Sequence, residues 1–247
     1  MKIEIVNRFD KIPDDGVVVV IDVIRAFTTA AYAFAAGAEK ILLVGSVDEA
    51  LELYVHHTNY LLMGELEGCP IPEFHFSNSP VEISEQALEG RTLIQRTSSG
   101  TQGVVAAKHG ERILVSSFVV AEATLRYILK LSPERVIFVV TGFTKGGDED
   151  RALAEYLEQR LLGNEVDATS YLERVMASPS GQIFASNKHA HYPEEDLAAV
   201  LDMNRFNFAM EVHKEKGQLV LRPVFEKGHN VLKDANDIAG IRKRRIT

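Results

Sequence analysis

The chain has 247 residues, of which 46% are hydrophobic and 25% charged, an ordinary globular composition large enough for a sizeable core. Its net charge of −8 disfavours nucleic acid as a partner, because phosphate backbones need broad basic surfaces. The single cysteine, Cys69, excludes an internal disulfide, and the N-terminal residues do not resemble a signal peptide, so we expect a cytoplasmic protein.

Strands are predicted to alternate with helices from residue 17 onward. The run VVVVID at 17–22 is typical of a strand buried on both faces, and the small residues at 28–38 predict a helix after it. Asp22 and Arg25 interrupt this apolar stretch, which argues against a membrane span. The next predicted strands are 40–44, 61–63, 91–95, 112–115 and 135–140, and the next predicted helices are 46–56, 81–89, 102–108, 119–130 and 149–162.

The last third of the chain is less regular in pattern. Residues 165–210 are predicted to be mainly helical, and 218–223 to form a further strand. The repeated strand–loop–helix order predicts an α/β fold with helices on both faces of a mostly parallel sheet. We expect one domain over residues 1–247, with a division near residue 165 as the alternative.

Unusual polar clusters follow the predicted strands, where parallel sheets collect their ligands. In the first, Asp22 ends a buried strand and is placed to hold a metal ion, while Arg25 offers a fork that matches phosphate oxygens. Thr28 and Thr29 lie where a helix start attracts anions. The alternative is structural: Asp22 caps the helix and Arg25 pairs with it.

A second cluster follows the strand at 91–95. Hydroxyl groups and a glycine at a strand-to-helix turn can cradle an anion, with an arginine as counter-charge. A helix cap rich in serine and threonine explains the same residues. The candidate substrate-binding residues of this turn are Arg96, Thr97, Ser98, Ser99, Gly100 and Thr101.

Two further loops carry acidic residues. The long loop 64–80 places Glu65 near Asn78 and Ser79, and oxygen donors of this kind suit Mg²⁺; an ordinary surface loop is the alternative. Glu149 and Asp150 lie in the glycine-rich stretch 142–150, where stabilisation of a helix N-terminus also accounts for acids. Ser117, after the strand at 112–115, repeats the pattern.

Five segments in order resemble the 2-phosphosulfolactate phosphatases. They are DVIRAFTTAAYAFAAGA, GELEGCPIPEFHFSNSPVEI, RTSSGT, SSF and TGFTKGGDED, spread over residues 15–165. The resemblance implies a three-layer α/β fold, dependence on Mg²⁺, hydrolysis of a phosphate monoester on a sulfonated three-carbon acid, and a homodimer. The residues that match the family's motifs, and to which the resemblance assigns the site, are Asp22, Arg25, Thr29, Glu65, Asn78, Ser79, Thr97, Gly100, Thr101, Glu149 and Asp150.

The chain departs from the family pattern in two places. Residues 73–80 read EFHFSNSP where the family has G-F-D-x-G-N-S-P, and residues 97–101 read TSSGT where the family has T-T-N-G-T. Loss of an acid and of glycines puts a metal or substrate contact in doubt. A phosphatase of different specificity and a non-catalytic sensor of a phosphorylated metabolite therefore stay open as alternatives.

The resulting hypothesis assigns catalysis to Asp22, Arg25 and Glu65. Mg²⁺ would be held by Asp22 and Glu65, with Glu149 or Asp150 as a further ligand. Arg25, Thr29 and the turn at 97–101 would neutralise charge on the phosphoryl group, and Arg96 would hold a carboxylate or sulfonate. The expected partner is a small phosphorylated anion.

Overall fold

Ten strands make one sheet in the computed structural model, which describes residues 1–142, 148–188 and 190–225. Their order across the sheet is β1-β8-β2-β7-β9-β10-β3-β6-β4-β5. The strands are β1 (Lys2–Asn7), β2 (Val17–Ile21), β3 (Lys40–Leu43), β4 (Leu61–Leu66), β5 (Cys69–Pro70), β6 (Thr92–Arg96), β7 (Arg112–Ser116), β8 (Arg135–Val140), β9 (Phe208–Glu215) and β10 (Gln218–Phe225).

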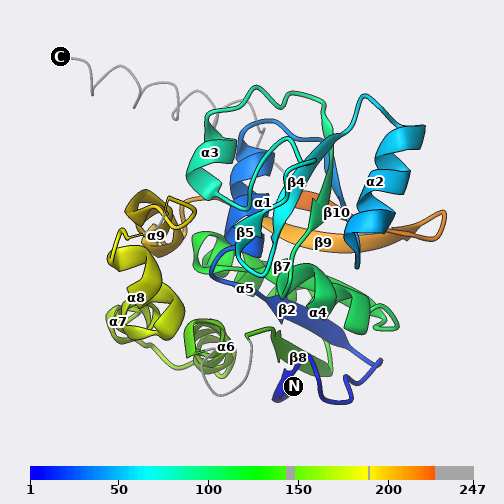
Figure 1. Cartoon of the computed structure of the whole chain (residues 1–247). Coiled ribbons are helices and arrows are strands. Elements are labelled where there is room, and N and C mark those ends of the chain that lie inside the picture. Colours follow the sequence, from blue (N-terminus) through cyan, green and yellow to red (C-terminus); the bar gives the residue numbers. More distant parts are fainter. Residues whose placement is uncertain (143–147, 189, 226–247) are drawn as a thin grey trace.

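Helices cover both faces of the sheet, as the fully buried strand β2 requires. Val18 and Val20 of β2 pack with α1, whereas Val17 and Val19 pack with α5 and α6 on the other face. The three-layer α/β fold is therefore confirmed (Figure 1). The helices are α1 (Ala26–Ala35), α2 (Val47–His56), α3 (Pro80–Ser84), α4 (Gly100–Ala106), α5 (Ala121–Leu131), α6 (Asp148–Leu161), α7 (Thr169–Ala177), α8 (Pro179–Ala185) and α9 (Glu194–Leu201).

The sheet consists of two parallel blocks joined by an antiparallel hairpin. Strands β1, β8, β2 and β7 pair in parallel, and so do β3, β6 and β4. The hairpin of β9 and β10 lies between the blocks and pairs antiparallel with β7 on one side and β3 on the other. The expectation of a mostly parallel sheet is confirmed, with this hairpin as the exception.

The carboxyl ends of the two blocks meet although three antiparallel pairings separate them. Arg8, which follows β1, donates from Nη1 to the carbonyl oxygen of Ser98, which follows β6, over 2.9 Å. Twist accumulates across a sheet of many strands, and here side chains from both blocks share one core with α1. The polar ends of distant strands are thereby brought to one place.

The elements differ from the sequence predictions in several places. The loop predicted at 64–80 contains the end of β4 and the short strand β5. Strand β1 was not predicted, and β9 lies partly in the stretch 165–210 that was expected to be mainly helical. Both strands are held by pairing with distant partners, β8 and β7, which no local pattern indicates. The helix predicted at 81–89 ends at Ser84.

Helices α7, α8 and α9 gather at the opposite end of the molecule from α2 (Figure 1). Each is short, and within the described ranges no helix combines the length and apolar character that crossing a membrane requires. The expectation of one domain over the whole chain stays a prediction.

Gly64 in β4 gives a test of how closely β4 and β6 approach each other. Its φ is +145°, and a Cβ there would lie 1.9 Å from the carbonyl oxygen of Arg96. We expect Gly64→Ala to cost more than about 3 kcal/mol of unfolding free energy, because both the strained φ and the backbone clash act. Urea unfolding would measure the loss.

Gly163→Ala is the matched control for this test. Gly163 also has a positive φ, +83°, but no atom lies within 4 Å of the added Cβ. Its expected cost is only about 1 kcal/mol, from the backbone conformation. Equal losses in the two variants would contradict the close approach at Gly64.

Candidate functional site

A cleft of about 800 Å³ opens where the strand ends meet. Three arginines and two buried or half-buried acids contribute to its wall: Arg8, Arg25 and Arg96, with Asp22 and Glu65. Such a mixture of clustered guanidinium groups above carboxylates suits a small, strongly anionic ligand. The cleft also receives Ser180, Phe184 and Tyr192 from the segment that spans α8 and the start of α9, together with Phe9, Ile24, Leu66, Glu67, Gly68, Asn78, Ser98, Ser99, Gln102 and Ile183.

Asp22 follows β2 at the base of the cleft and is 4% exposed. Its Oδ1 accepts a hydrogen bond from the N–H of Ala26 at 2.9 Å, so it does cap α1. Its Oδ2 has only a 3.4 Å contact with the Thr141 hydroxyl. Burial, together with the negative charges of Glu65 and Glu149, raises the pKa of Asp22 to about 7. Asp22 is therefore an acid that is poised near neutral pH, with one oxygen weakly bound.

Asp150, in the first turn of α6, ties the loops after β2 and β8 together. Its carboxylate accepts from the N–H groups of Val23, Thr141 and Gly142 and from the Thr141 hydroxyl, at 2.8–3.1 Å. Burial and the charge of Asp22 raise the pKa of Asp150, and these N–H donors oppose the rise. Because both oxygens are occupied, Asp150 is placed as a support for Asp22.

Glu149 presents a buried oxygen that no described residue satisfies. Its Oε1 accepts from the Ser180 hydroxyl at 2.8 Å, whereas Oε2 has no partner within the described part of the chain. Burial also raises the pKa of Glu149. An unpartnered carboxylate oxygen that repels Asp22 is a favourable position for a cation.

The acids predicted to hold Mg²⁺ divide into two kinds. Asp22 and Glu149 each keep an oxygen without a strong donor, whereas the oxygens of Asp150 and Glu65 accept backbone N–H groups. In residues 1–142, 148–188 and 190–225, no three His, Cys, Asp or Glu side chains are grouped to hold a metal ion. Mg²⁺ often binds through one or two carboxylates plus substrate phosphate, so Asp22 and Glu149 fit that mode.

Glu65, at the end of β4, organises the turn after β6. One oxygen accepts from the N–H of Ser98, and the other accepts from the N–H of Gly68 at 2.6 Å and from the Ser98 hydroxyl at 3.1 Å. The carbonyl oxygen of Glu65 also accepts from Arg96 at 2.8 Å. Glu65 thus joins two walls of the cleft, and its predicted catalytic and metal roles stay predictions.

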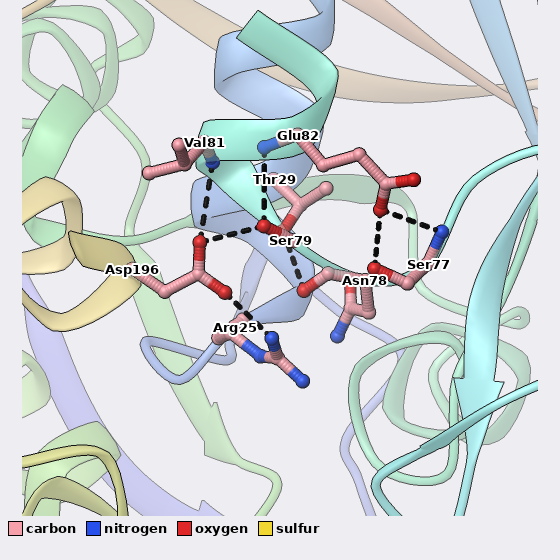
Figure 2. A network of polar contacts seen from close by, with 8 residues as sticks. All are labelled: Arg25, Thr29, Ser77, Asn78, Ser79, Val81, Glu82 and Asp196. Carbon is pink, nitrogen blue, oxygen red and sulfur yellow. Dashed lines mark hydrogen bonds and ion pairs between the residues drawn. The ribbon is translucent and has the colours of Figure 1, made fainter. Parts of the chain in front are cut away.

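Arg25 is buried, and its partner is not the one that the structural alternative named. Its Nη1 donates to Oδ2 of Asp196 in α9 at 2.6 Å, rather than to Asp22 (Figure 2). The guanidinium carbon lies 4.6 Å from the centre of the Phe184 ring and 5.7 Å from that of Tyr192. The charge is therefore held on several sides while the residue still lines the cleft.

Arg96 carries a charge that no acid of the described residues neutralises. It makes no ion pair with any described residue; Nη1 donates to a carbonyl oxygen and to the Ser98 hydroxyl, and the buried Nε has no partner. Arg8 lies nearby, and burial lowers its pKa while the carboxylates of Asp22 and Asp150 oppose that effect. Both residues add positive potential to the cleft that faces Asp22.

The threonines and serines predicted to bind substrate are mostly engaged in the fold. Thr28 donates to the carbonyl oxygen of Val23 at 2.8 Å, and Thr29 donates to that of Asn78 at 3.2 Å. Ser79 caps α3 by accepting from the N–H of Glu82 at 3.1 Å (Figure 2). Asn78 differs, because it lines the cleft and its buried Oδ1 lacks a partner among the described residues.

The turn after β6 shows the same division. Thr97 and Thr101 bond to each other through hydroxyl and backbone at 2.9–3.0 Å, which locks the turn. Gly100 packs under Asp22, since a Cβ would lie 2.5 Å from that of Ala26 and 2.9 Å from Oδ2 of Asp22. Only Ser98 and Ser99, with Arg96, line the cleft from this turn.

One predicted residue lies away from the cleft, and part of one predicted cluster is not described. Ser117 is fully buried and is not among the cleft-lining residues, although its hydroxyl has no partner within the described residues. Residues 143–147 of the fourth cluster lie outside the described residues.

The divergent segment 73–77 does not line the cleft either. Its His75 accepts from the N–H of Leu62 through Nδ1 at 3.1 Å, and Phe74 and Phe76 pack against the core. The acid that the family pattern has at position 75 is thus replaced in a place remote from the cleft.

Sequence reasoning missed Arg8, Asp196, Ser180, Phe184 and Tyr192. Arg8 follows a strand that was not predicted, although the alternation in KIEIV was a usable signal. Asp196 occurs among acids in the first turn of α9, where a helix dipole explains them all. Nothing local distinguishes Asp196 from its exposed neighbours Glu194 and Glu195.

Comparisons with known proteins point to one family. The family model described as 2-phosphosulpholactate phosphatase matches residues 3–214. A Bacillus subtilis protein named "Probable 2-phosphosulfolactate phosphatase" is 34% identical over 202 residues, which is 81% of this chain and 88% of the relative. A protein of the same name from Carboxydothermus hydrogenoformans is 32% identical over 233 residues, 90% of this chain and 97% of the relative.

The charge of Asp22 is expected to cost stability at neutral pH. Its pKa is 3.8 in its reference state and about 7 in the fold, so the native state holds the proton more tightly and wild type loses stability as pH rises between these values. Asp22→Asn keeps the acceptor for Ala26. At about pH 8 it should therefore be more stable than wild type by a few kcal/mol, and at about pH 4 nearly equal.

Chemical denaturation in metal-free buffer at several pH values would measure this difference. Glu52→Gln, at an exposed acid of α2, is the control and should show no such pH-dependent gain. An Asp22→Asn protein that is less stable than wild type throughout would contradict the account of a buried, repelled carboxylate.

Proposed function

The chain belongs to the 2-phosphosulfolactate phosphatase family, and we propose that it hydrolyses 2-phosphosulfolactate to sulfolactate and phosphate with the help of Mg²⁺. Membership makes it a phosphoric monoester hydrolase. The observation that carries the choice of substrate is the group of three arginines around one cleft, beside the acids at its base.

The anionic groups of the proposed substrate match the arginines of the cleft in number: there are three of each. Phosphosulfolactate carries a phosphate, a carboxylate and a sulfonate, and the wall of the cleft supplies Arg8, Arg25 and Arg96. Guanidinium groups bind such planar or tetrahedral oxyanions through paired N–H donors. We assign the phosphoryl group to Arg25, beside Asp22, and a second anionic group to Arg96, which is paired with no acid in the described part of the chain.

The reaction needs little covalent chemistry from the protein. A water oxygen bonds to phosphorus, the bond from phosphorus to the substrate's C2 oxygen breaks, and a proton of the water ends on the hydroxyl group of sulfolactate. Positioned positive charge stabilises the phosphoryl oxygens during this transfer. Arg25 supplies that charge in the proposal, and Asn78 supplies a polar contact from its unpartnered side chain.

Asp22 and Glu149 would hold Mg²⁺. The cation would neutralise phosphoryl charge and lower the pKa of a bound water. Asp150 supports this arrangement by fixing the backbone on both sides of Asp22, and Glu65 by fixing the Ser98 turn.

The departures from the family pattern at 73–77 lie outside the lining of the cleft, whereas those at 97–101 include Ser98 and Ser99, which line it. A phosphatase of different specificity therefore stays the alternative. A homodimer and a cytoplasmic location stay predictions.

Dependence on Mg²⁺ is tested by phosphate release from 2-phosphosulfolactate in Mg²⁺ or in EDTA. We expect release by wild type with Mg²⁺ only, and a loss of about 100-fold or more in Asp22→Asn. As a readout independent of turnover, Mg²⁺ should raise the melting temperature of wild type, where it relieves the repulsion at Asp22, and should not raise that of Asp22→Asn. Full activity in EDTA would refute the metal part of the proposal.

Arg96 should determine recognition of the second anionic group. Arg96→Gln is expected to lower kcat/KM for 2-phosphosulfolactate by about 10- to 100-fold, because a charge-assisted hydrogen bond is lost. The loss should be smaller for a phosphate monoester that lacks both carboxylate and sulfonate.

Arg91→Gln is the matched control, since Arg91 precedes β6 at its other end and its side chain donates to the carbonyl oxygen of Asn59. Steady-state kinetics would measure kcat/KM of both variants on both substrates. Equal losses on both substrates in Arg96→Gln would refute the assignment.

A further inference from the structure

Asp196 is a buried acid that joins three separate parts of the chain. Its side chain is fully buried, and it lies in the first turn of α9, 171 residues from Arg25 in sequence. Oδ2 accepts from Arg25 at 2.6 Å, while Oδ1 accepts from the Ser79 hydroxyl at 2.7 Å and from the N–H of Val81 at 3.2 Å (Figure 2). Both oxygens are thus used for contacts outside its own helix.

These contacts connect Asp196 to two cleft residues without bringing Asp196 itself into the cleft. Arg25 and Asn78 line the cleft, and Asp196 does not. Asn78 precedes Ser79, and its carbonyl oxygen accepts from Thr29 at 3.2 Å, so Ser79 and Thr29 together fix its backbone (Figure 2). Asp196 therefore acts on Arg25 directly and on Asn78 through Ser79.

Among the groups around Arg25, Asp196 is the one that determines the orientation of the guanidinium group. Phe184 and Tyr192 provide ring contacts, which restrict the guanidinium plane but do not fix which nitrogen faces the cleft. The ion pair engages one nitrogen, Nη1, and leaves the remaining donors of the fork for other acceptors. A short pair between buried groups is a rigid orientation device of this kind.

A helix-dipole role does not explain Asp196. The exposed acids Glu194 and Glu195 occupy the same first turn and serve that purpose without a buried charge. Burying a carboxylate is costly unless it is paired and hydrogen-bonded. Of the partners found here, Arg25 lines the cleft and Ser79 adjoins Asn78, which also lines it.

We propose that Asp196 is a positioning residue for phosphate-monoester hydrolysis: it orients Arg25 toward the phosphoryl group and sets the Asn78 backbone in the same arrangement. The inference rests on the function proposed above. In this proposal, a residue of α9, late in the chain, aligns Arg25, which follows β2 near the start of the chain.

The experiment is a double-mutant cycle with Asp196→Asn and Arg25→Met. Asparagine keeps the size of Asp196 and an oxygen for Ser79 and Val81, but it presents an N–H₂ or a neutral oxygen to Arg25. The readouts are kcat and KM for 2-phosphosulfolactate with Mg²⁺, the Kd of inorganic phosphate by calorimetry, and the melting temperature. Glu195→Gln, which removes an exposed charge from the same helix turn, is the matched control.

We expect Asp196→Asn to lower kcat/KM by about 10- to 100-fold and to weaken phosphate binding, because Arg25 is misdirected. In the Arg25→Met background the same change should alter both values by less than about twofold, since the residue it orients is absent. Glu195→Gln should match wild type. If Arg25→Met does not fold, Arg25→Gln, which removes the charge but keeps a polar side chain of similar reach, replaces it in the cycle.

Two results would overturn the inference. One is a lower melting temperature in Asp196→Asn with unchanged kinetics and phosphate Kd, which is the outcome of a purely structural role. The other is an equal loss with and without Arg25. Absence of turnover by wild type would refute the proposed function instead, and the cycle would then be judged on the phosphate Kd.

Discussion

The arrangement of the cleft depends on one buried carboxylate, that of Asp150. It receives N–H groups from the loops after two neighbouring strands, β2 and β8, and so holds the ends of those strands in a fixed relation. Burying an anion in a protein interior is unfavourable unless donors replace the lost water, and backbone N–H groups are donors that cannot rotate away. Asp22, Thr141 and the start of α1 take their positions from this support.

Around Asp150 the fold holds several carboxylates and arginines close together in the cleft. Asp22 lies in the field of Glu65 and Glu149, and the arginines lie in the wall above. Like charges at the base weaken the native state. Of the arginines in the wall, Arg8 is attracted to Asp22, whereas Arg25 is already paired with Asp196 and Arg96 bonds to neutral groups. The cleft thus contains carboxylate oxygens and a guanidinium group without counter-ions, and a bound cation together with a bound anion would neutralise them.

The parts of the molecule that local pattern determines were predictable. The buried run of β2, the cap of α2 at Ser46 and the polar strand ends follow from periodicity and capping, and the Ser46 hydroxyl accepts from the N–H of Glu49 as expected. Asp196 was not predictable, because its role comes from contacts with residues more than 100 positions away. The same holds for Arg8, since its strand is defined by pairing with β8.

The hairpin of β9 and β10 has a consequence for the order in which the protein can be completed. Neither parallel block touches the other in the ladder, since β7 and β3 meet only through this late hairpin. During synthesis on the ribosome, the edge at β7 stays unpaired until β9 has emerged, and the edge at β3 until β10 has emerged. Exposed edges invite pairing with other chains, so the nascent protein passes through an aggregation-sensitive interval that ends only when its last described strand inserts.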